Sequence, residues 1–366
     1  MTRVLYVHGG LLNTGGTESV MMNFYRNIDR EKVHIDFLLH GFGKAVYDDE
    51  IISSGGKIFN VVPKGQNPVE NTKQVREIIK NGNYDVVHAH MDAGNAQILK
   101  IAKELNVPLR ISHSHNTATQ TSNPLKKVFN EFEKKKIYKY ATHLFACSDL
   151  AGKWLYGDKA FTVINNAIDV QRFEYSPELR NEMRKRLGIS EDNVVLGHIG
   201  RFSYQKNHEK LITVFNSYLK KHPDAFLIMI GAGETKESTK KAVEDLKIEK
   251  NVLFVEPNNE TNKYMQAMDC FVMPSRFEGL PVVTVEAQAA ALPIVISDTV
   301  SKKCALTDLV RFVPLEADDD DWCSAIDEAL KTKRYSRLEE LGQAGYDIKD
   351  SAVKMQRFYM TGELLF

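Results

Sequence analysis

The sequence has few cysteines, and their spacing does not match a disulfide or metal-binding motif. Only four of its 366 residues are cysteine, namely Cys147, Cys270, Cys304 and Cys323. They lie far apart and form no CxxC pair, which argues against a zinc ribbon and against a disulfide scaffold. We therefore expect four reduced thiols in the interior of the protein.

Long hydrophobic segments are also missing. No stretch of the chain approaches the roughly 20 apolar residues that a membrane-spanning helix needs. The N-terminal segment MTRVLYVHGG contains one basic residue and a short apolar run that His8 and two glycines interrupt, which differs from the pattern of a secretory signal. These absences predict a cytoplasmic protein.

The chain lacks an excess of charge of either sign. Its 48 basic and 48 acidic residues give a formal net charge of zero, so no field of the whole molecule favours a nucleic-acid partner. Hydrophobic residues make up 43% and charged residues 26% of the chain. This composition is close to the globular average and excludes a disordered or fibrous protein. The length favours two domains.

What the sequence does contain is an alternation of short apolar runs with amphipathic stretches. Such alternation is typical of βαβ units with a parallel sheet, and the nearly continuous β-branched runs predict strands buried on both faces. The runs occupy residues 4–7, 34–39, 85–90, 109–115 and 143–148, and then 193–200, 225–231, 251–256, 270–275 and 293–298. A polar connector near residues 165–180 separates the two predicted α/β domains. Ligands of such sheets bind at the carboxyl ends of the strands.

The strongest pattern in the second half is the segment PSRFEGLPVVTVEAQAAALP. An apolar strand ends here, a loop follows with Glu278 and Gly279, and Pro281 can open a helix that carries Glu286. Backbone amides at the helix start suit a phosphate, and carboxylates suit hydroxyl groups. A sugar nucleotide offers both partners. The alternative is that the two glutamates only cap and solvate a helix.

Two segments upstream add to this pattern. In GRFSYQKNHEKLI, Arg201 and Lys206 lie between a strand end and a helix start, where two cations would neutralise a diphosphate. In FLIMIGAGE, a strand runs into Gly231 and Gly233, where absent side chains let the backbone approach a ligand. Taken singly, the cations are more often solvated surface charges, and the glycine pair is a weak signal.

The order GRF..QKN, GAGE and then E-x(7)-E, in the form FEGLPVVTVE, resembles the retaining glycosyltransferases of the GT-B fold in the large glycosyltransferase family four, of the group 1 type. The resemblance extends over nearly the whole chain. It implies an α/β protein of two facing Rossmann-like domains with parallel sheets. The acceptor domain would comprise residues 1–168 and the donor domain residues 169–350, with a C-terminal helix at 351–366 crossing back to the first domain.

The resemblance also implies roles for the residues of the second half. Glu286 would hold the ribose hydroxyls and Glu278 the donor sugar, while Arg201 and Lys206 would hold the diphosphate. The further substrate contacts expected in this domain are Gly231, Gly233, Gly279 and Leu280. No metal and no cofactor are expected.

In the first half, the segment HGGLLNTGGTESVMMNF places Gly15 and Gly16 before a predicted helix, so that free amides would point into a ligand site. By the resemblance, Gly16 would approach the donor phosphate or the acceptor. The alternative is a simple loop. The glycine pattern of this segment differs from the GxGxxG motif of nicotinamide-binding folds.

Four histidines form two HxH pairs, His88 with His90 and His113 with His115, each near the end of a predicted strand. The period of two places both rings of a pair on one face. With Asp92 nearby, the pairs could ligate the metal of a hydrolase. The resemblance instead implies that His115, or else His113, contacts the donor sugar or the acceptor. A purely structural role for each histidine is an equal alternative.

The segment at residues 123–140 is rich in lysine. Its six lysines outnumber Glu131 and Glu133 and give a net charge of plus four. With interleaved apolar residues, they predict an amphipathic basic helix that contacts the anionic inner face of the cell membrane. The alternative is a solvated helix face over the first domain's core. The lysines are Lys126, Lys127, Lys134, Lys135, Lys136 and Lys139.

These features predict a retaining, metal-independent transferase that moves a hexosyl or N-acetylhexosaminyl group. The expected donor is a nucleotide sugar, with a uridine diphosphate sugar favoured. The expected acceptor is a hydroxyl of a glycan or lipid-linked glycan in exopolysaccharide or capsule assembly. The alternatives are a sugar-nucleotide epimerase or another enzyme on the same fold, a noncatalytic nucleotide-sugar-binding subunit, and a metal-dependent hydrolase that uses the HxH pairs.

Overall fold

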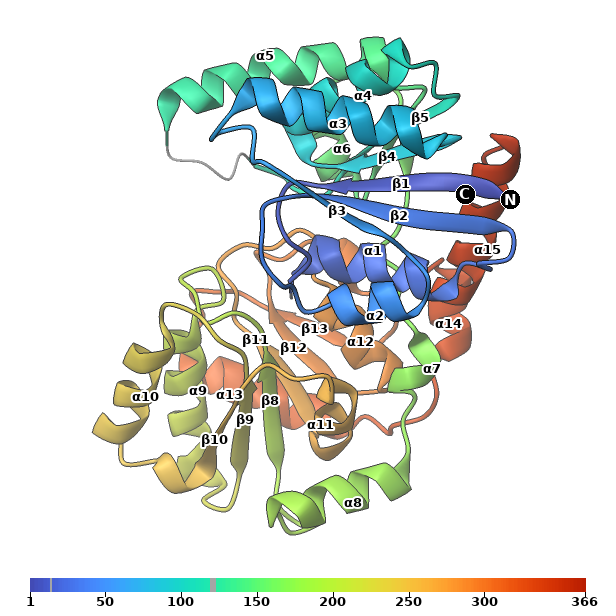
Figure 1. Cartoon of the computed structure of the whole chain (residues 1–366). Coiled ribbons are helices and arrows are strands. Elements are labelled where there is room, and N and C mark those ends of the chain that lie inside the picture. The colour runs from blue at the N-terminus through green and yellow to red at the C-terminus, as the bar shows by residue number, and fades with distance from the viewer. Residues whose placement is uncertain (14, 119–122) are drawn as a thin grey trace. The chain divides into compact units, whose positions relative to one another are not determined.

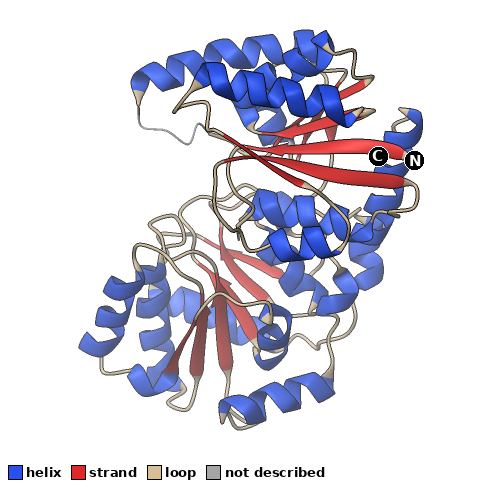
Figure 2. Cartoon of the chain, viewed as in Figure 1, coloured by secondary structure: helices blue, strands red, loops and turns tan. Residues whose placement is uncertain are grey.

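The computed structural model describes residues 1–13, 15–118 and 123–366 (Figure 1). The chain divides into two compact units. The first consists of Met1–Ala167 together with Ile348–Phe366, and the second of Ile168–Asp347. Each unit is a parallel sheet with helices on both faces, as Figure 2 shows by the red strands and blue helices. The expected α/β class is therefore confirmed.

The first unit is built on a seven-stranded sheet in the order β3-β2-β1-β4-β5-β6-β7, and all its pairs are parallel. The order reverses between β1 and β4, which is the place where a doubly wound sheet opens a crevice at its carboxyl edge. The strands are β1 (Thr2–His8), β2 (Val33–His40), β3 (Ile58–Val61), β4 (Val86–His90), β5 (Leu109–Ser114), β6 (His143–Ala146) and β7 (Thr162–Val163).

Alternate residues of β1 enter two separate cores because successive side chains of a strand point to opposite faces. Val4 and Tyr6 pack with α1 (Gly16–Asn27), α2 (Asp48–Ser53) and α15 (Ile348–Thr361). Leu5 and Val7 pack on the other face, which four helices cover. Figure 1 shows these two helical layers on either side of the sheet. The four helices are α3 (Pro68–Gly82), α4 (Asn95–Glu104), α5 (Pro124–Tyr140) and α6 (Asp149–Tyr156).

The second unit has a six-stranded parallel sheet in the order β10-β9-β8-β11-β12-β13, which reverses between β8 and β11. Its strands are β8 (Val195–Ile199), β9 (Phe226–Ile230), β10 (Val252–Val255), β11 (Cys270–Met273), β12 (Ile294–Ser297) and β13 (Val310–Val313).

Helices cover both faces of the second sheet. On one face, Phe271 and Met273 share a core with α7 (Val170–Phe173), α8 (Pro177–Leu187), α11 (Thr261–Ala267), α12 (Val282–Ala289) and α14 (Leu338–Gln343). On the other, Val272 packs with α9 (His208–Lys221), α10 (Lys236–Asp245) and α13 (Asp319–Leu330). The ends of β9, β8 and β11 therefore lie side by side in the sheet.

The C-terminal helix belongs to the first unit. In α15, Met355, Phe358 and Tyr359 are buried in the core that contains Val4. The Tyr359 hydroxyl lies 3.0 Å from the Tyr6 hydroxyl at the centre of the sheet. The last segment of the chain thus completes a core that begins with its first strand.

All four cysteines are free thiols, as predicted. Three of them are buried and Cys147 is partly buried. Burial raises the pKa of the Cys270 thiol to about 12, so this group stays protonated. No helix in the described ranges of the chain combines the length and the hydropathy that crossing a membrane requires.

Candidate functional site

In the second unit, three loops meet at the carboxyl edge of the sheet, and hydrogen bonds tie the loop after β8 to each of the other two. The loop after β11 is held to the loop after β8 because the Arg276 amide donates to the Gln205 carbonyl at 2.8 Å. The Arg276 guanidinium donates to Asn207 Oδ1 at 2.9 Å, and the Gln205 amide group donates to the Phe277 carbonyl at 3.0 Å. The loop that carries Glu278 is therefore fixed against the loop that carries Lys206.

The clearest feature of this edge is an ion pair between two predicted site residues. Lys206 Nζ lies 2.7 Å from Glu278 Oε1, and the two side chains are only 14% and 10% exposed. Burial removes much of the screening by water, so the pair is stronger than a surface ion pair. The structure thus brings together a cation suited to phosphate and an acid suited to sugar hydroxyls.

Arg201 differs from Lys206 in its surroundings. Its guanidinium donates to Glu234 Oε2 at 3.1 Å, and its side chain is 74% exposed. The two cations predicted to act together therefore have different carboxylate partners. The role of Arg201 toward a diphosphate stays a prediction.

The glycines after β9 have a packing reason that the sequence does not reveal. A Cβ atom at Gly231 would lie 2.0 Å from the Gly200 carbonyl oxygen, and one at Gly233 would lie 2.3 Å from the Phe202 carbonyl oxygen. Gly233 also has a φ of +151°, which side chains disfavour. The close backbone approach is thus between the loops after β8 and β9, and a contact with ligand stays a prediction.

Glu286 lies on α12 and is half-buried. Within the described ranges, its carboxylate makes no hydrogen bond or ion pair. Burial raises its pKa from 4.5 to about 7, and the nearby charge of Arg172 offsets part of this rise. A partly dehydrated carboxylate without a partner is suited to accept hydrogen bonds from a ligand's hydroxyl groups.

The loop before α12 leaves room for a ligand at one position. A Cβ at Gly279 would meet no atom within 4 Å, so no packing contact in the described chain requires glycine there. Leu280 is partly buried against the core of the unit. The helix begins at Val282 with Pro281 as its N-cap, one residue later than the sequence suggests.

In the first unit, the glycine turn lies where it is predicted, at the start of α1. Gly15 is the N-cap and Gly16 the first helical residue. A Cβ at Gly16 would meet no atom within 4 Å, whereas one at Gly15 would lie 2.3 Å from Glu18 Oε2. The turn is open at Gly16, as a ligand-facing amide requires. The preceding Thr14 lies outside the described residues.

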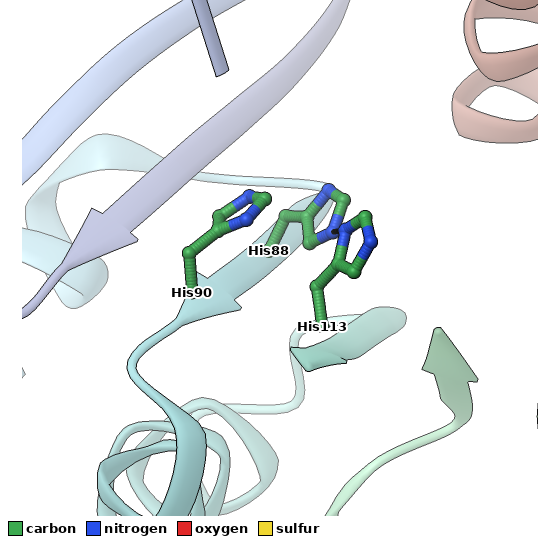
Figure 3. Close-up of side chains that lie close together, drawn as sticks. All are labelled: His88, His90 and His113. Atoms are coloured by element: carbon green, nitrogen blue, oxygen red, sulfur yellow. Dashed lines mark hydrogen bonds between the residues drawn. The ribbon is translucent and has the colours of Figure 1, made fainter. Parts of the chain in front are cut away.

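The two HxH pairs come together because β4 and β5 are neighbours in the sheet. We call His88, His90, His113 and His115 the histidine ladder. Nε2 of His88 lies 3.2 Å from Nδ1 of His113, and Nδ1 of His90 lies 2.8 Å from Nε2 of His115. Figure 3 shows the rings of His88, His90 and His113 side by side, projecting from these two strands.

Tyr359 extends the ladder from the C-terminal helix, because its hydroxyl lies 2.7 Å from Nδ1 of His88. Burial lowers the pKa of all four histidines, and that of His115 falls to about 3. The ladder is therefore uncharged at neutral pH. Of its members, only His115 is partly exposed, and it follows the end of β5.

One nitrogen from each of His88, His90 and His113 lies within 4.8 Å of the others. Neutral imidazoles are ligands that zinc accepts. Both nitrogens of His88 already have hydrogen-bond partners, so the cluster holds together without an ion. The Asp92 carboxylate does not join it, since it accepts from the Asn116 side chain at 2.7 Å. Among the described residues, the arrangement thus lacks the carboxylate that the hydrolase alternative relied on.

Sequence patterns identify strand ends but not the partners that tertiary structure supplies. Tyr359 is 271 residues from His88, and no local signal links them. The same holds for Arg276, whose hydrogen bonds join the loops after β8 and β11 in the second unit. These residues support the site and were missed by sequence analysis.

Comparisons with known proteins agree with this architecture. Residues 14–172 match the model of Glycosyltransferase Family 4 and residues 180–347 that of Glycosyl transferases group 1. The "Putative glycosyltransferase EpsF" of Bacillus subtilis is 35% identical, covering 98% of this chain and 96% of that protein. The capsular polysaccharide biosynthesis glycosyltransferase CapH of Staphylococcus aureus is 24% identical over the full length of both.

Solved structures share the fold at low identity. The crystal structure of Anabaena HepE in complex with UDP has a TM-score of 0.79 at 16% identity, covering 99% of this chain and all of that one. HepE in complex with UDP-glucose has a TM-score of 0.71 at 16% identity, covering 99% of each chain.

Proposed function

This chain belongs to the group 1 glycosyltransferases of glycosyltransferase family 4, and we propose that it transfers a sugar from a uridine diphosphate donor with retention of anomeric configuration. The acceptor is a hydroxyl of a glycan or lipid-linked glycan in exopolysaccharide or capsule assembly. UDP in a protein of the same fold and the role of CapH in capsule synthesis support these assignments. The second unit binds the donor and the first unit the acceptor.

The Lys206–Glu278 pair is the observation that carries this proposal. Departure of the nucleoside diphosphate places negative charge on its outer phosphate. The largely shielded ammonium of Lys206 stabilises that charge more in the transition state than in the ground state. Glu278 orients the donor sugar through its hydroxyls. Arg201 and the amides near Gly279 and Leu280 add to phosphate binding.

Glu286 and His115 complete the assignment. Glu286 accepts hydrogen bonds from the ribose, which suits a carboxylate that has no partner in the described chain. His115 is neutral at physiological pH and donates a hydrogen bond to the sugar or phosphate as charge develops. Charge stabilisation by these groups needs no metal ion, and the acceptor hydroxyl attacks from the face that the phosphate leaves.

The different roles proposed for Glu278 and Glu286 provide a test of the proposal. Glu286→Gln should weaken UDP binding, whereas Glu278→Gln should lower turnover and leave the affinity for UDP nearly unchanged. Calorimetry with UDP and initial rates with a UDP-sugar measure the two effects. Equal losses in both assays for both variants would contradict the assigned roles. If the product is an epimerised free nucleotide sugar, the enzyme is an epimerase and not a transferase.

Membrane contact is a second part of the proposal, and the surface of α5 supports it. Its apolar stripe, which consists of Leu125, Val128, Phe129 and Phe132, is 50–82% exposed. Residues spaced by three and four share one helix face, and Lys135 and Lys139 continue that face and are exposed. Exposed apolar and basic groups together favour an anionic lipid surface.

Two lysines of this helix are engaged in contacts within the chain. Lys134 is buried, lies 2.7 Å from Glu131 and sits 3.8 Å from the centre of the Trp154 ring. Lys136 pairs with Glu133 at 2.6 Å. The side chain of Lys126 lies outside the described part of the chain.

Reversal of exposed lysines tests the membrane contact. Replacing Lys127, Lys135 and Lys139 by Glu should release the protein from vesicles that contain anionic lipid, because each basic residue near such a surface contributes about 1 kcal/mol. Three exposed lysines of the second unit, Lys220, Lys241 and Lys250, provide a control of equal charge change. Equal release by both sets, or no binding of the parent at low salt, would remove this part.

A further inference from the structure

The contact between His90 and His115 can hold only one proton. Nδ1 of His90 and Nε2 of His115 are 2.8 Å apart, and both rings are neutral because burial lowers their pKa values. One of these nitrogens must therefore donate and the other accept. The choice decides which nitrogen of His115 carries a proton for any ligand.

The surroundings of His90 decide between the two arrangements. Nε2 of His90 is buried and has no hydrogen-bond partner in the described chain. If His90 accepted from His115, its own proton would lie on Nε2 as an unpaired, buried N–H. If His90 donates from Nδ1, only a lone pair is left unpaired on Nε2. Orphaned buried N–H groups are rarer than under-used acceptors in proteins.

Packing fixes the planes of the two rings. The His90 ring stacks on that of His88 at 4.2 Å and meets the edge of Tyr6 at 5.3 Å. The His115 ring stacks on that of His113 at 4.2 Å. A half-turn of either imidazole about its Cβ–Cγ bond would keep this stacking but would replace one nitrogen of the 2.8 Å contact by a carbon, so the contact itself fixes which nitrogens meet. The remaining nitrogen of His115, Nδ1, has no hydrogen-bond partner among the described residues.

We propose that His90 is a positioning residue that donates its Nδ1 proton to Nε2 of His115 and so holds His115 in the tautomer with its proton on Nδ1. His115 then presents an N–H donor, which fits an acceptor oxygen of a phosphate or a sugar hydroxyl. The functional consequence rests on the role proposed above for His115, whereas the tautomer itself depends only on the geometry of the first unit.

The tautomer can be measured in the unmodified protein. Two-bond nitrogen–proton correlation spectra distinguish imidazoles protonated on Nδ1 from those protonated on Nε2. In the full-length protein at pH 7, the His115 signals should show the Nδ1-protonated pattern, and His90 should show the same pattern. A proton on Nε2 of His115 overturns the proposal without the need for any variant.

Two substitutions test the effect on catalysis. His90→Leu removes the donor, so His115 should become a mixture of tautomers and turnover should fall about 10- to 100-fold, the range for residues that orient a functional group. The affinity for UDP should change less than twofold. In His90→Asn the side-chain amide takes the place of Nδ1–H, so this variant should recover most of the lost turnover and keep the His115 tautomer.

A double variant shows whether His90 acts through His115. Combining His90→Leu with His115→Ala should be no slower than His115→Ala alone, because the two residues form one unit. Additive losses, or equal turnover in His90→Leu and the parent while His115→Ala is slow, overturn the proposal. If His115→Ala is fully active while His90→Leu still shifts the tautomer, the proposed role of His115 fails and the positioning by His90 stands. His143→Gln, on the neighbouring strand β6, controls for the loss of a histidine from this sheet.

Discussion

At the scale of single residues, charge is distributed unevenly among the groups assigned to the donor. Lys206 is shielded and faces Glu278, whereas Arg201 is largely exposed and faces Glu234. Because water screens exposed charges, one elementary charge contributes less to phosphate binding at Arg201 than at Lys206. The sequence alone does not distinguish the two cations.

The first prediction compares these cations. Lys206→Ala should weaken UDP binding by about 1.5 to 3 kcal/mol, the range for a charge-assisted contact. Arg201→Ala should weaken it by about 1 kcal/mol or less. Isothermal calorimetry at fixed ionic strength measures both. A larger loss for Arg201→Ala would show that this side chain is drawn into the phosphate site, and unchanged affinity in both variants would remove the diphosphate assignment.

The second prediction concerns the pH dependence that Glu286 imposes on stability. Its pKa is about 7 in the folded protein and 4.5 as the reference value. The folded state thus holds the proton more tightly, so the contribution of this group to stability falls as pH rises from about 4.5 to 7. From pH 5.5 to 8 the parent should lose about 2 kcal/mol of unfolding free energy relative to Glu286→Gln.

Urea unfolding of both proteins at these two pH values provides the measurement. The exposed Glu244 offers a control, since Glu244→Gln should follow the parent at both. A constant difference between the parent and Glu286→Gln would show that this carboxyl is not dehydrated in the free protein.

At the scale of elements, the sequence predicts strands and the loops that follow them, and it predicts much less about what those loops contact. The carboxyl ends of β8, β9 and β11 are predictable because buried parallel strands read as continuous apolar runs. The direct pairing of Lys206 with Glu278 depends on the sheet order, which places β8 next to β11. That adjacency is a property of the tertiary structure. It cannot be inferred from the sequence, in which β9 and β10 separate the two strands.

The histidines illustrate the same limit. The period of two correctly places each HxH pair on one face of its strand, yet only the pairing of β4 with β5 stacks the four rings into a ladder. Sequence analysis could propose a metal site or a substrate contact from these residues. It could not show that Nδ1 of His88 bonds to the Tyr359 hydroxyl or that His90 bonds to His115, because each of these partners comes from another element.

The third prediction concerns the loop after β9. Gly233→Ala should destabilise the protein by about 1 to 3 kcal/mol, because its Cβ would lie 2.3 Å from the Phe202 carbonyl, which is backbone and cannot move aside. Gly65→Ala is the matched control, since a Cβ there would meet no atom within 4 Å. Thermal unfolding compares the two variants. Equal melting temperatures would show that the loops after β8 and β9 are not held as closely as the structure indicates.

At the scale of the whole molecule, the chain returns to its first unit only through the C-terminal helix. The second unit, Ile168–Asp347, is inserted between two segments that fold together. The core of the first unit therefore includes Ile348, Met355 and Phe358 from the end of the chain together with Val4 and Phe37 from its beginning. Completion of this core needs the entire polypeptide.

The last prediction uses this arrangement to separate the two units by stability. Phe358 is fully buried, and its ring lies against those of Phe145 and His143 at centroid distances of 5.2 and 4.8 Å. Phe358→Ala should cost about 3 to 5 kcal/mol, the range for deleting a buried aromatic ring. Val353, on the same helix, is 65% exposed, so Val353→Ala should change stability by less than about 0.5 kcal/mol.

The loss in Phe358→Ala should appear in the first unit alone. Hydrogen exchange should show faster opening of β1, β4 and β5 and unchanged protection of β8 and β11, because the second unit has its own cores. UDP binding, assigned to the second unit, should keep its affinity below the unfolding transition, whereas turnover, in which we propose a role for His115 after β5, should fall. Loss of protection in both units together would show that they unfold as one cooperative body. Loss of UDP binding in the folded variant would show that UDP binding itself depends on the first unit.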